Sequence, residues 1–494
     1  MHRQRRADAT QIDPLEALTS LADTSLVVLG EMADGEPRVT MLETVREFAH
    51  EELERQLGGE VAVVRDVHVE WYLRLAEAAA GELTGPDQLS WLDRLEVEHD
   101  NMRAALEWSA SRPGDRGLRM AAALWRFWWV RGHATEGRAW LEQVVANHAG
   151  GVSAARAAAL YAAGELTESQ ADYGRAEELF ERALAERQLL DDDVGVAECW
   201  NGLGIVARAT GRLEQAEAFH EQALEVVRAT GDQRGVAVSL GNLAAVAYYR
   251  GDLLRAGSVW EEVVGIARDL GDLRSAAMML GNVGAVRLAE GDAEGAVAAQ
   301  EEVLSITRTL NDIGGMAHTL VNLGEALFER GELERAEAAY DEALDLSRQI
   351  GEPRTEATVL HGIGKLAQSR GDLALAAEHY SGSLAVFSTV GEAAGVAGCL
   401  ERLGGLAIRL GDHERGVRLF GAAARIRERS GTTPEGHDQL SVNSALEVAR
   451  AELGAAGYDT AWQTGQKQSQ DAITADTSAV VSSAADAPAT APRH

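Results

Sequence analysis

A glycine that returns every 40 residues is the feature that most constrains the fold of this chain. It occurs six times without a change of spacing, at Gly211, Gly251, Gly291, Gly331, Gly371 and Gly411. The segments that follow it share one pattern, as in GRLEQAEAFHEQAL and GELERAEAAYDEAL. Two less regular copies begin at Gly132 and Ala171, so eight units are visible. A fixed period of this length predicts a stack of similar units, each packed on its neighbours.

Each unit carries two apolar stripes of helical period, one on either side of the glycine. Leu320, Leu323 and Leu327 illustrate the first stripe. A second turn separates successive units, and it reads Gly-Asp, Asn-Asp or Gly-Glu. Glycine and asparagine tolerate the left-handed conformation that ends a helix, and the following acid favours the start of the next one. The pattern therefore predicts an all-α chain of helical hairpins.

Small residues recur in phase on both helices, which implies that the backbones approach closely, because interior glycine otherwise weakens a helix. On the first helix they are Gly164, Gly204, Gly284, Gly324, Gly364 and Gly404. With these, Leu320, Gly331, Ala336, Tyr340 and Ala343 follow a pattern that resembles the tetratricopeptide repeat. The resemblance covers about residues 118–430, with a period of 40 in place of the usual 34 or so. It implies a right-handed α-solenoid of about eight 40-residue hairpins.

The region before the repeats has a different pattern. Residues 12–57 are predicted to form a helix, a strand at Ser25–Leu29, a turn at 33–36, a strand at Pro37–Met41 and a helix. This order is typical of the last helix and β-wing of a winged-helix domain. The segments LTSLADTSLVV and VTMLETVREFAHEEL resemble the module that joins the ATPase to the repeats in actinobacterial transcriptional regulators of the signal-transduction ATPase class. In that class the repeats act as a sensor or docking arm.

The ATPase itself is not visible in this sequence. Lys365 lies in HGIGKLA, which lacks the first glycine of a phosphate-binding loop and has Leu366 where Ser or Thr is required. The sequence leaves open whether residue 1 is the true start or an upstream ATPase domain is missing. The predicted divisions are a disordered N-terminus over 1–11, a winged-helix remnant over 12–57, a helical cap or linker over 58–117, the repeat superhelix with C-terminal capping helices over 118–465, and a disordered tail over 466–494.

Charge and composition argue against some classes of binding partner. The chain has 78 acidic and 46 basic residues, a net charge of −32, which argues against nucleic acid and anionic membranes as partners. No apolar stretch reaches the roughly 20 residues of a membrane helix. The two cysteines, Cys199 and Cys399, share one phase five repeats apart, so they are not expected to pair. A cytoplasmic location is predicted.

Three asparagines, Asn242, Asn282 and Asn322, share one phase on the first helices. The resemblance implies that this phase lies on the concave face, where such amides hold the backbone of a bound peptide. A primary amide both donates and accepts, so it binds main chain without preference for side chains. The alternative is that each amide bonds a neighbouring helix of the stack. The same phase analysis places four further residues in the groove: His318, Glu325, His361 and Lys365.

No catalytic, cofactor or metal motif was found in the sequence, since GxSxG, HExxH and CxxC are all missing. The aromatic run Trp125, Phe127, Trp128 and Trp129 is interpreted as a capping core, with a ligand pocket as the alternative. The predicted function is a non-catalytic protein-binding or peptide-binding module of a cytoplasmic regulatory system. A separately encoded ATPase at the N-terminal remnant is a second candidate partner. The alternatives are a DNA-associated transcriptional regulator, or one half of a longer ATPase-type regulator without an independent role.

Overall fold

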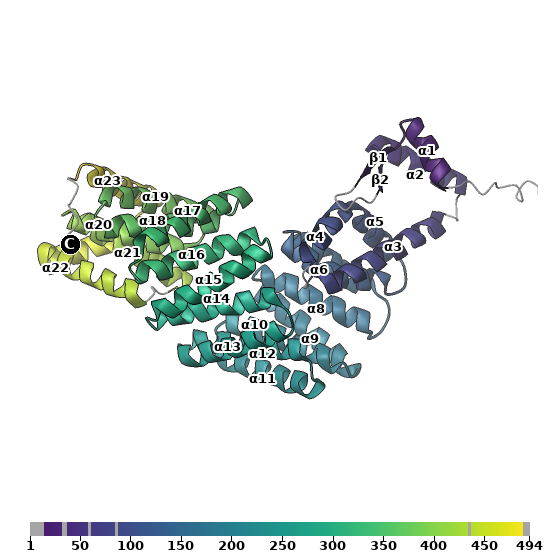
Figure 1. The fold of residues 1–494 in the computed structure, drawn as a ribbon, viewed down its shortest axis with the longest axis horizontal. Helices are drawn as coiled ribbons and strands as arrows, with labels where there is room; N and C mark the ends of the chain where they lie inside the picture. The colour runs from purple at the N-terminus through teal and green to yellow at the C-terminus, as the bar shows by residue number, and fades with distance from the viewer. Residues whose placement is uncertain (1–13, 32–36, 58–60, 84–86, 433–435, 488–494) are drawn as a thin grey trace, which may run out of the picture. The chain divides into compact units, whose positions relative to one another are not determined.

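The computed structural model describes residues 14–31, 37–57, 61–83, 87–432 and 436–487 (Figure 1). These residues form 23 helices and one pair of strands. The fold is therefore all-α apart from a small hairpin near the N-terminus. The chain divides into two compact units, Met1–Leu190 and Asp191–His494.

The first unit begins with a helix-hairpin-helix segment: α1 (Pro14–Asp23), β1 (Val28–Glu31), β2 (Pro37–Thr40) and α2 (Glu43–Leu57). The strands are antiparallel, with Val28 opposite Thr40 and Leu29 opposite Val39. The first strand begins three residues later than predicted, because Ser25 adopts a positive φ of 58° and the amide of Leu26 bonds back to Leu21. This segment is compatible with a winged-helix remnant. The predicted turn at 33–36 and the predicted disorder over 1–11 lie outside the described residues.

Seven further helices complete the first unit. They are α3 (Val61–Glu82), α4 (Gln88–Val97), α5 (His99–Ala110), α6 (Arg116–Val130), α7 (Ala134–Asn147), α8 (Ala154–Ser169) and α9 (Tyr173–Leu189). Helix α6 packs against α3, α7 and α8. Its Phe127 and Trp128 are fully buried, whereas Trp129 is 54% exposed. The aromatic run therefore does not converge on one pocket, and two of its members form core.

The second unit stacks six helical hairpins and a C-terminal pair. The hairpins are α10 (Asp193–Ala209) with α11 (Leu213–Thr230), α12 (Gln233–Tyr249) with α13 (Leu253–Asp269), α14 (Leu273–Ala289) with α15 (Ala293–Thr309), α16 (Ile313–Glu329) with α17 (Leu333–Ile350), α18 (Pro353–Ser369) with α19 (Leu373–Val390), and α20 (Ala393–Arg409) with α21 (His413–Ser430). Each helix packs on the next along the chain, as the succession of coils in Figure 1 shows.

The turn glycines behave as their spacing predicts. Gly251 and Gly331 have φ values of 81° and 82°, in the left-handed region that glycine adopts without strain. At Gly251 the chain turns sharply, since the amide of Asp252 bonds to the carbonyl of Ala247. The Asp252 carboxylate then accepts from the amide of Arg255 and caps α13. One turn ends one helix and starts the next, which fixes the hairpin.

The in-phase glycines of the first helices leave room for a large ring on the second helix. A Cβ added at Gly324 would lie 2.6 Å from Tyr340, and one at Gly364 would lie 2.7 Å from Tyr380. Both tyrosines are buried. His220 takes the ring position over Gly204 in the first hairpin of this unit. The glycine and ring pair is therefore the contact that sets the helix separation inside a hairpin.

The predicted disordered tail over 466–494 is wrong for most of its length. Helix α22 (Gly436–Lys467) and helix α23 (Gln470–Ala485) follow the hairpins, and α23 packs on α19, α20 and α21. Ile473, Val480 and Ala484 of α23 are buried in the core of these hairpins. A short apolar stripe at helical spacing is enough to dock a helix on a preformed apolar face. Residues 488–494 lie outside the described residues.

Candidate functional site

The first helices of the hairpins crowd together on one side of the second unit. Helix α10 contacts α12, and α16 contacts both α14 and α18. Within the described residues, no second helix contacts the second helix of the next hairpin to that extent. Helices approach most closely on the inner side of a curved stack, so these contacts favour the first helices as its concave side. This face carries the candidate site.

The three asparagines are half-buried on this face, Asn242 on α12, Asn282 on α14 and Asn322 on α16. Among the described residues, none hydrogen-bonds to the side-chain amides of these three. In two of the hairpins, the residue just before the asparagine accepts a hydrogen bond from the second helix. Trp260 donates to the carbonyl of Gly241, and Gln300 donates to the carbonyl of Gly281, each at 3.2 Å. The amides therefore remain directed to solvent with unused donors and acceptors.

Exposed apolar side chains lie one helical turn before the asparagines. Val238 is 50% exposed and Met278 is 60% exposed. His318 occupies the same phase on α16 and is exposed as well. Loss of hydration nevertheless lowers the pKa of His318, with Glu352 opposing and Arg354 reinforcing the shift. A side chain that is exposed yet poorly hydrated is expected on a concave surface.

Glu325 and Lys365 form a bridge between two hairpins. The ammonium of Lys365 on α18 contacts the Glu325 carboxylate on α16 and lies 3.9 Å from Glu329. Tyr340 donates to the same Glu325 carboxylate at 3.2 Å. Burial opposes ionisation of Glu325, but the Lys365 charge and these hydrogen bonds outweigh it and hold the pKa of Glu325 below its usual range. Lys365 is only 8% exposed, so its side chain links two hairpins and is not accessible to a ligand in the groove.

His361 points toward the interior of the next hairpin. Its Nδ1 lies 3.7 Å from the sulfur of Cys399, and its ring lies 5.2 Å from that of Tyr380. The Cys399 thiol donates to Ser383 at 3.2 Å. Burial raises the pKa of Cys399 to about 12, so the sulfur stays protonated and is a poor nucleophile. Both cysteines are buried, and neither forms a disulfide within the described residues.

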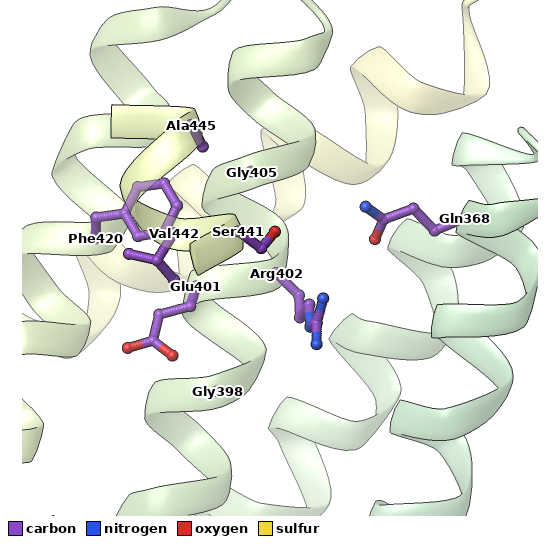
Figure 2. Close-up of a pocket in the computed structure, with 9 residues that line it drawn as sticks. All are labelled: Gln368, Gly398, Glu401, Arg402, Gly405, Phe420, Ser441, Val442 and Ala445. Carbon is purple, nitrogen blue, oxygen red and sulfur yellow. The ribbon is translucent and has the colours of Figure 1, made fainter. Parts of the chain in front are cut away.

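A pocket lies at the C-terminal end of the row of first helices (Figure 2). Gln368 of α18 stands across it from Arg402 of α20 and Ser441 of α22, and Phe420 lies at its side. Arg402 occupies the phase of the three asparagines. The Glu401 carboxylate beside it is held by Arg427 through two hydrogen bonds of 2.7 and 2.8 Å. Gly362 occupies this phase on α18, so a position without a side chain separates Asn322 from the Arg402 guanidinium.

A second group of polar side chains lies in the first unit, and the sequence analysis missed it. Glu96, His99 and His133 bring one potential ligand atom each to within 4.8 Å of one another. They come from the end of α4, the start of α5 and the turn before α7. No single-segment motif contains them, because 34 residues separate the two histidines. The pair Glu96 and His99, three residues apart, was the available signal.

Part of the repeat region matches a known protein family. Residues 155–229 and 315–389 match the family model of the tetratricopeptide repeat. These hairpins are tetratricopeptide repeats. The tetratricopeptide fold was thus predicted from the glycine period and the phase of the small residues, and the prediction is confirmed.

Two further comparisons are with individual known proteins. It is 36% identical over 143 residues to proteins of Mycobacterium bovis and Mycobacterium tuberculosis that are named as HTH-type transcriptional regulators. The match covers 28% of this chain and only 16% of each relative. A signal-transduction ATPase with a tetratricopeptide repeat sensor from Pyrococcus horikoshii shares the fold, with a TM-score of 0.54 and 14% identity over 92% of this chain and 61% of that one. The mycobacterial match supports the resemblance to regulators.

None of the helices that the structure describes is long and apolar enough to cross a membrane.

Proposed function

We propose that the tetratricopeptide repeats bind an extended peptide segment of a partner protein along the row of first helices, as the sensor or docking arm of a cytoplasmic regulatory system. The observation that carries the proposal is the row of Asn242, Asn282 and Asn322, whose amides find no partner among the described residues. Amides spaced along a concave face suit the repeating donors and acceptors of a peptide backbone. The role is one of binding, without catalysis.

The side chains beside the row indicate which peptide would fit. Val238 and Met278 offer exposed apolar contacts, and methionine adapts to different partner side chains. Arg402, at the same phase farther along the stack, adds a positive charge at the pocket. The peptide expected to bind is therefore extended, carries apolar side chains, and has an acidic group toward the α20 end. Both cysteines are buried and form no disulfide within the described residues, which agrees with a reducing compartment.

The test starts from peptides selected from a random displayed library with the wild-type chain. Their affinities are then measured by fluorescence anisotropy for wild type and for the triple variant Asn242→Ala, Asn282→Ala, Asn322→Ala. Each lost hydrogen bond contributes about 0.5–1.5 kcal/mol, so the triple variant should bind roughly 10-fold to 2,000-fold more weakly. Peptides N-methylated at the bonded amides should lose affinity in the same way.

A matched control removes uncharged polar groups from the second helices of the same three hairpins. Ser258, Ser305 and Gln349 are exposed on α13, α15 and α17. The triple alanine variant of these residues should bind as wild type does. Equal affinity of the asparagine variant and the control, with both still folded by circular dichroism, would remove the groove from the proposal.

A second candidate is a DNA-associated regulator, which the match to HTH-type transcriptional regulators favours. The net charge of −32 opposes it, because a phosphate backbone is repelled by such a surface. Anisotropy of a labelled random-sequence duplex at low salt decides the matter. Binding that falls steeply with added salt would support a DNA role, and no binding at low salt would end it.

The third candidate is that this chain works as the repeat half of a longer regulator, or with a separately encoded ATPase. Its motivation is the exposed apolar surface of the N-terminal segment, where Leu15 is 72% exposed and Val28 is 59% exposed. Aspartate at both positions should abolish co-purification of a co-expressed ATPase while leaving peptide binding in the groove unchanged. Retained co-purification would exclude this surface.

A further inference from the structure

The strongest unassigned group of side chains lies where two helix junctions of the first unit meet. Glu96 is in the last turn of α4, and His99 is the first residue of α5. His133 precedes α7 in the short turn after α6. The His133 Nε2 lies 3.2 and 3.3 Å from the two carboxylate oxygens of Glu96. The rings of His99 and His133 are 4.4 Å apart between centroids.

His99 supplies an independent sign that a ligand belongs here. It is only 6% exposed, yet its Nε2 has no hydrogen-bond partner in the described part of the chain. The Glu136 carboxylate comes within 3.7 Å, beyond hydrogen-bond range, and is held by Arg103 through two bonds of 2.5 Å and by Trp140. A buried nitrogen without a partner is costly. A cation bound at this nitrogen would satisfy it.

We propose that Glu96, His99 and His133 bind one zinc ion. Two imidazoles and one carboxylate are a donor set that zinc takes in proteins, with water in the fourth position. The imidazoles disfavour magnesium and calcium, which prefer oxygen ligands. The Glu136 carboxylate, fixed by Arg103, lies 3.7 Å from the His99 Nε2 and offsets the guanidinium charge next to the ion.

The geometry requires little movement. Tetrahedral zinc with bonds of about 2.0–2.2 Å places its ligand atoms roughly 3.3–3.6 Å apart. The three ligand atoms already lie within 4.8 Å of one another. The Glu96 and His133 side chains are 43% and 27% exposed, so both can rotate toward the buried His99. The helices that carry them need not shift.

Zinc at this point would join the α4–α5 junction to the turn before α7. Glu98, between two of the proposed ligands, accepts hydrogen bonds from Arg38 of β2, Tyr72 and Asn101. The same junction therefore contacts the N-terminal hairpin on one side and the proposed ion on the other. Bound zinc should stiffen this part of the first unit.

The test uses the full chain after removal of metal with a chelator. Isothermal titration with zinc chloride should show one tight site per chain. The variants His133→Gln and Glu96→Gln should each weaken that site by at least roughly tenfold, the loss that even an outer partner of a metal ligand causes. Cobalt, used as a spectroscopic substitute, should give visible absorption bands in wild type that both variants lose.

Asp93→Asn is the matched control. Asp93 lies one turn before Glu96 on α4, is 74% exposed and pairs with Arg131, so its change removes the same charge without removing a ligand. It should leave zinc affinity within about twofold of wild type, as expected of an exposed, screened charge. Both test variants alter partly exposed side chains, and circular dichroism confirms that they fold. Zinc binding that is unchanged in both variants, or magnesium binding as tight as zinc binding, would overturn the proposal.

Discussion

His220 makes a quantitative prediction about pH. The side chain is fully buried against Gly204, and its Nδ1 lies 3.0 Å from the Oδ1 of Asn201. The Asn201 amide nitrogen donates to Ser239, so its oxygen is the acceptor and the His220 Nδ1 carries the proton. Protonation would then add a charge at Nε2, which has no partner in the described residues. Burial first, and then the charge of Arg208, lower the pKa of His220 from 6.5 to about 4.

Folding stability should decrease as the pH falls, because the pKa of His220 is lower in the folded state than in the unfolded state. Between the two values the unfolded chain binds more protons, so stability is lost as pH falls through this window. From pH 7.5 to 5.5 the loss from this one residue is about 1.3 kcal/mol, and any folded pKa below roughly 5 gives nearly the same figure. The lower pH remains above the isoelectric point of 4.8, which keeps the chain charged.

The assay compares urea unfolding of wild type and His220→Phe at both pH values by circular dichroism. Phenylalanine fits the site, because Phe180 packs over Gly164 in the same way. The variant should lose about 1.3 kcal/mol less than wild type over this pH range, whatever its absolute stability. An identical pH dependence for wild type and His220→Phe would refute the burial argument.

Two further variants test the packing. Gly324→Ala should destabilise the stack by about 1–3 kcal/mol in urea unfolding, because the new methyl group overlaps the buried Tyr340 ring; Gly265→Ala on α13, where a Cβ meets open space, should stabilise it by roughly 0.5–1 kcal/mol, and equal effects of the two changes would contradict the role of the in-phase glycines. Val480→Asp on α23 should expose the C-terminal segment to limited proteolysis, because a carboxylate cannot stay in the core, whereas Ser482→Asp on the exposed face of the same helix should not; equal protection of both variants would show that α23 does not dock.

The hairpins could be predicted from the sequence because one contact between their two helices recurs every 40 residues. A glycine and a ring, held at a fixed spacing, set each hairpin, so the pattern in Gly324 and Tyr340 carries over to its neighbours. The C-terminal helix was missed since small and polar residues dominate its composition. Its signal was present, however: Ile473, Thr477, Val480 and Ala484 follow the spacing of one buried helix face. Composition alone was the wrong criterion there.

The site residues were predictable only where the repeat relates them. Glu325 and Lys365 are 40 residues apart, which is the period itself, so their pairing between successive hairpins could have been inferred from the spacing. The sequence placed Lys365 in the groove, but it could not show that the neighbouring hairpin covers it. Glu96, His99 and His133 lie outside the regular repeats, and their meeting depends on how three junctions pack. No sequence period relates such residues.

The burial of Lys365 also decides how the protein can be labelled or modified. The chain has two lysines, and one of them is closed off by its contact with Glu325. Lys467, at the exposed end of α22, is the other. Amine-directed reagents, and enzymes that acetylate or ubiquitylate lysine, therefore meet a single accessible side-chain amine. A fluorophore attached there reports from the C-terminal end of the stack without any need to engineer a cysteine.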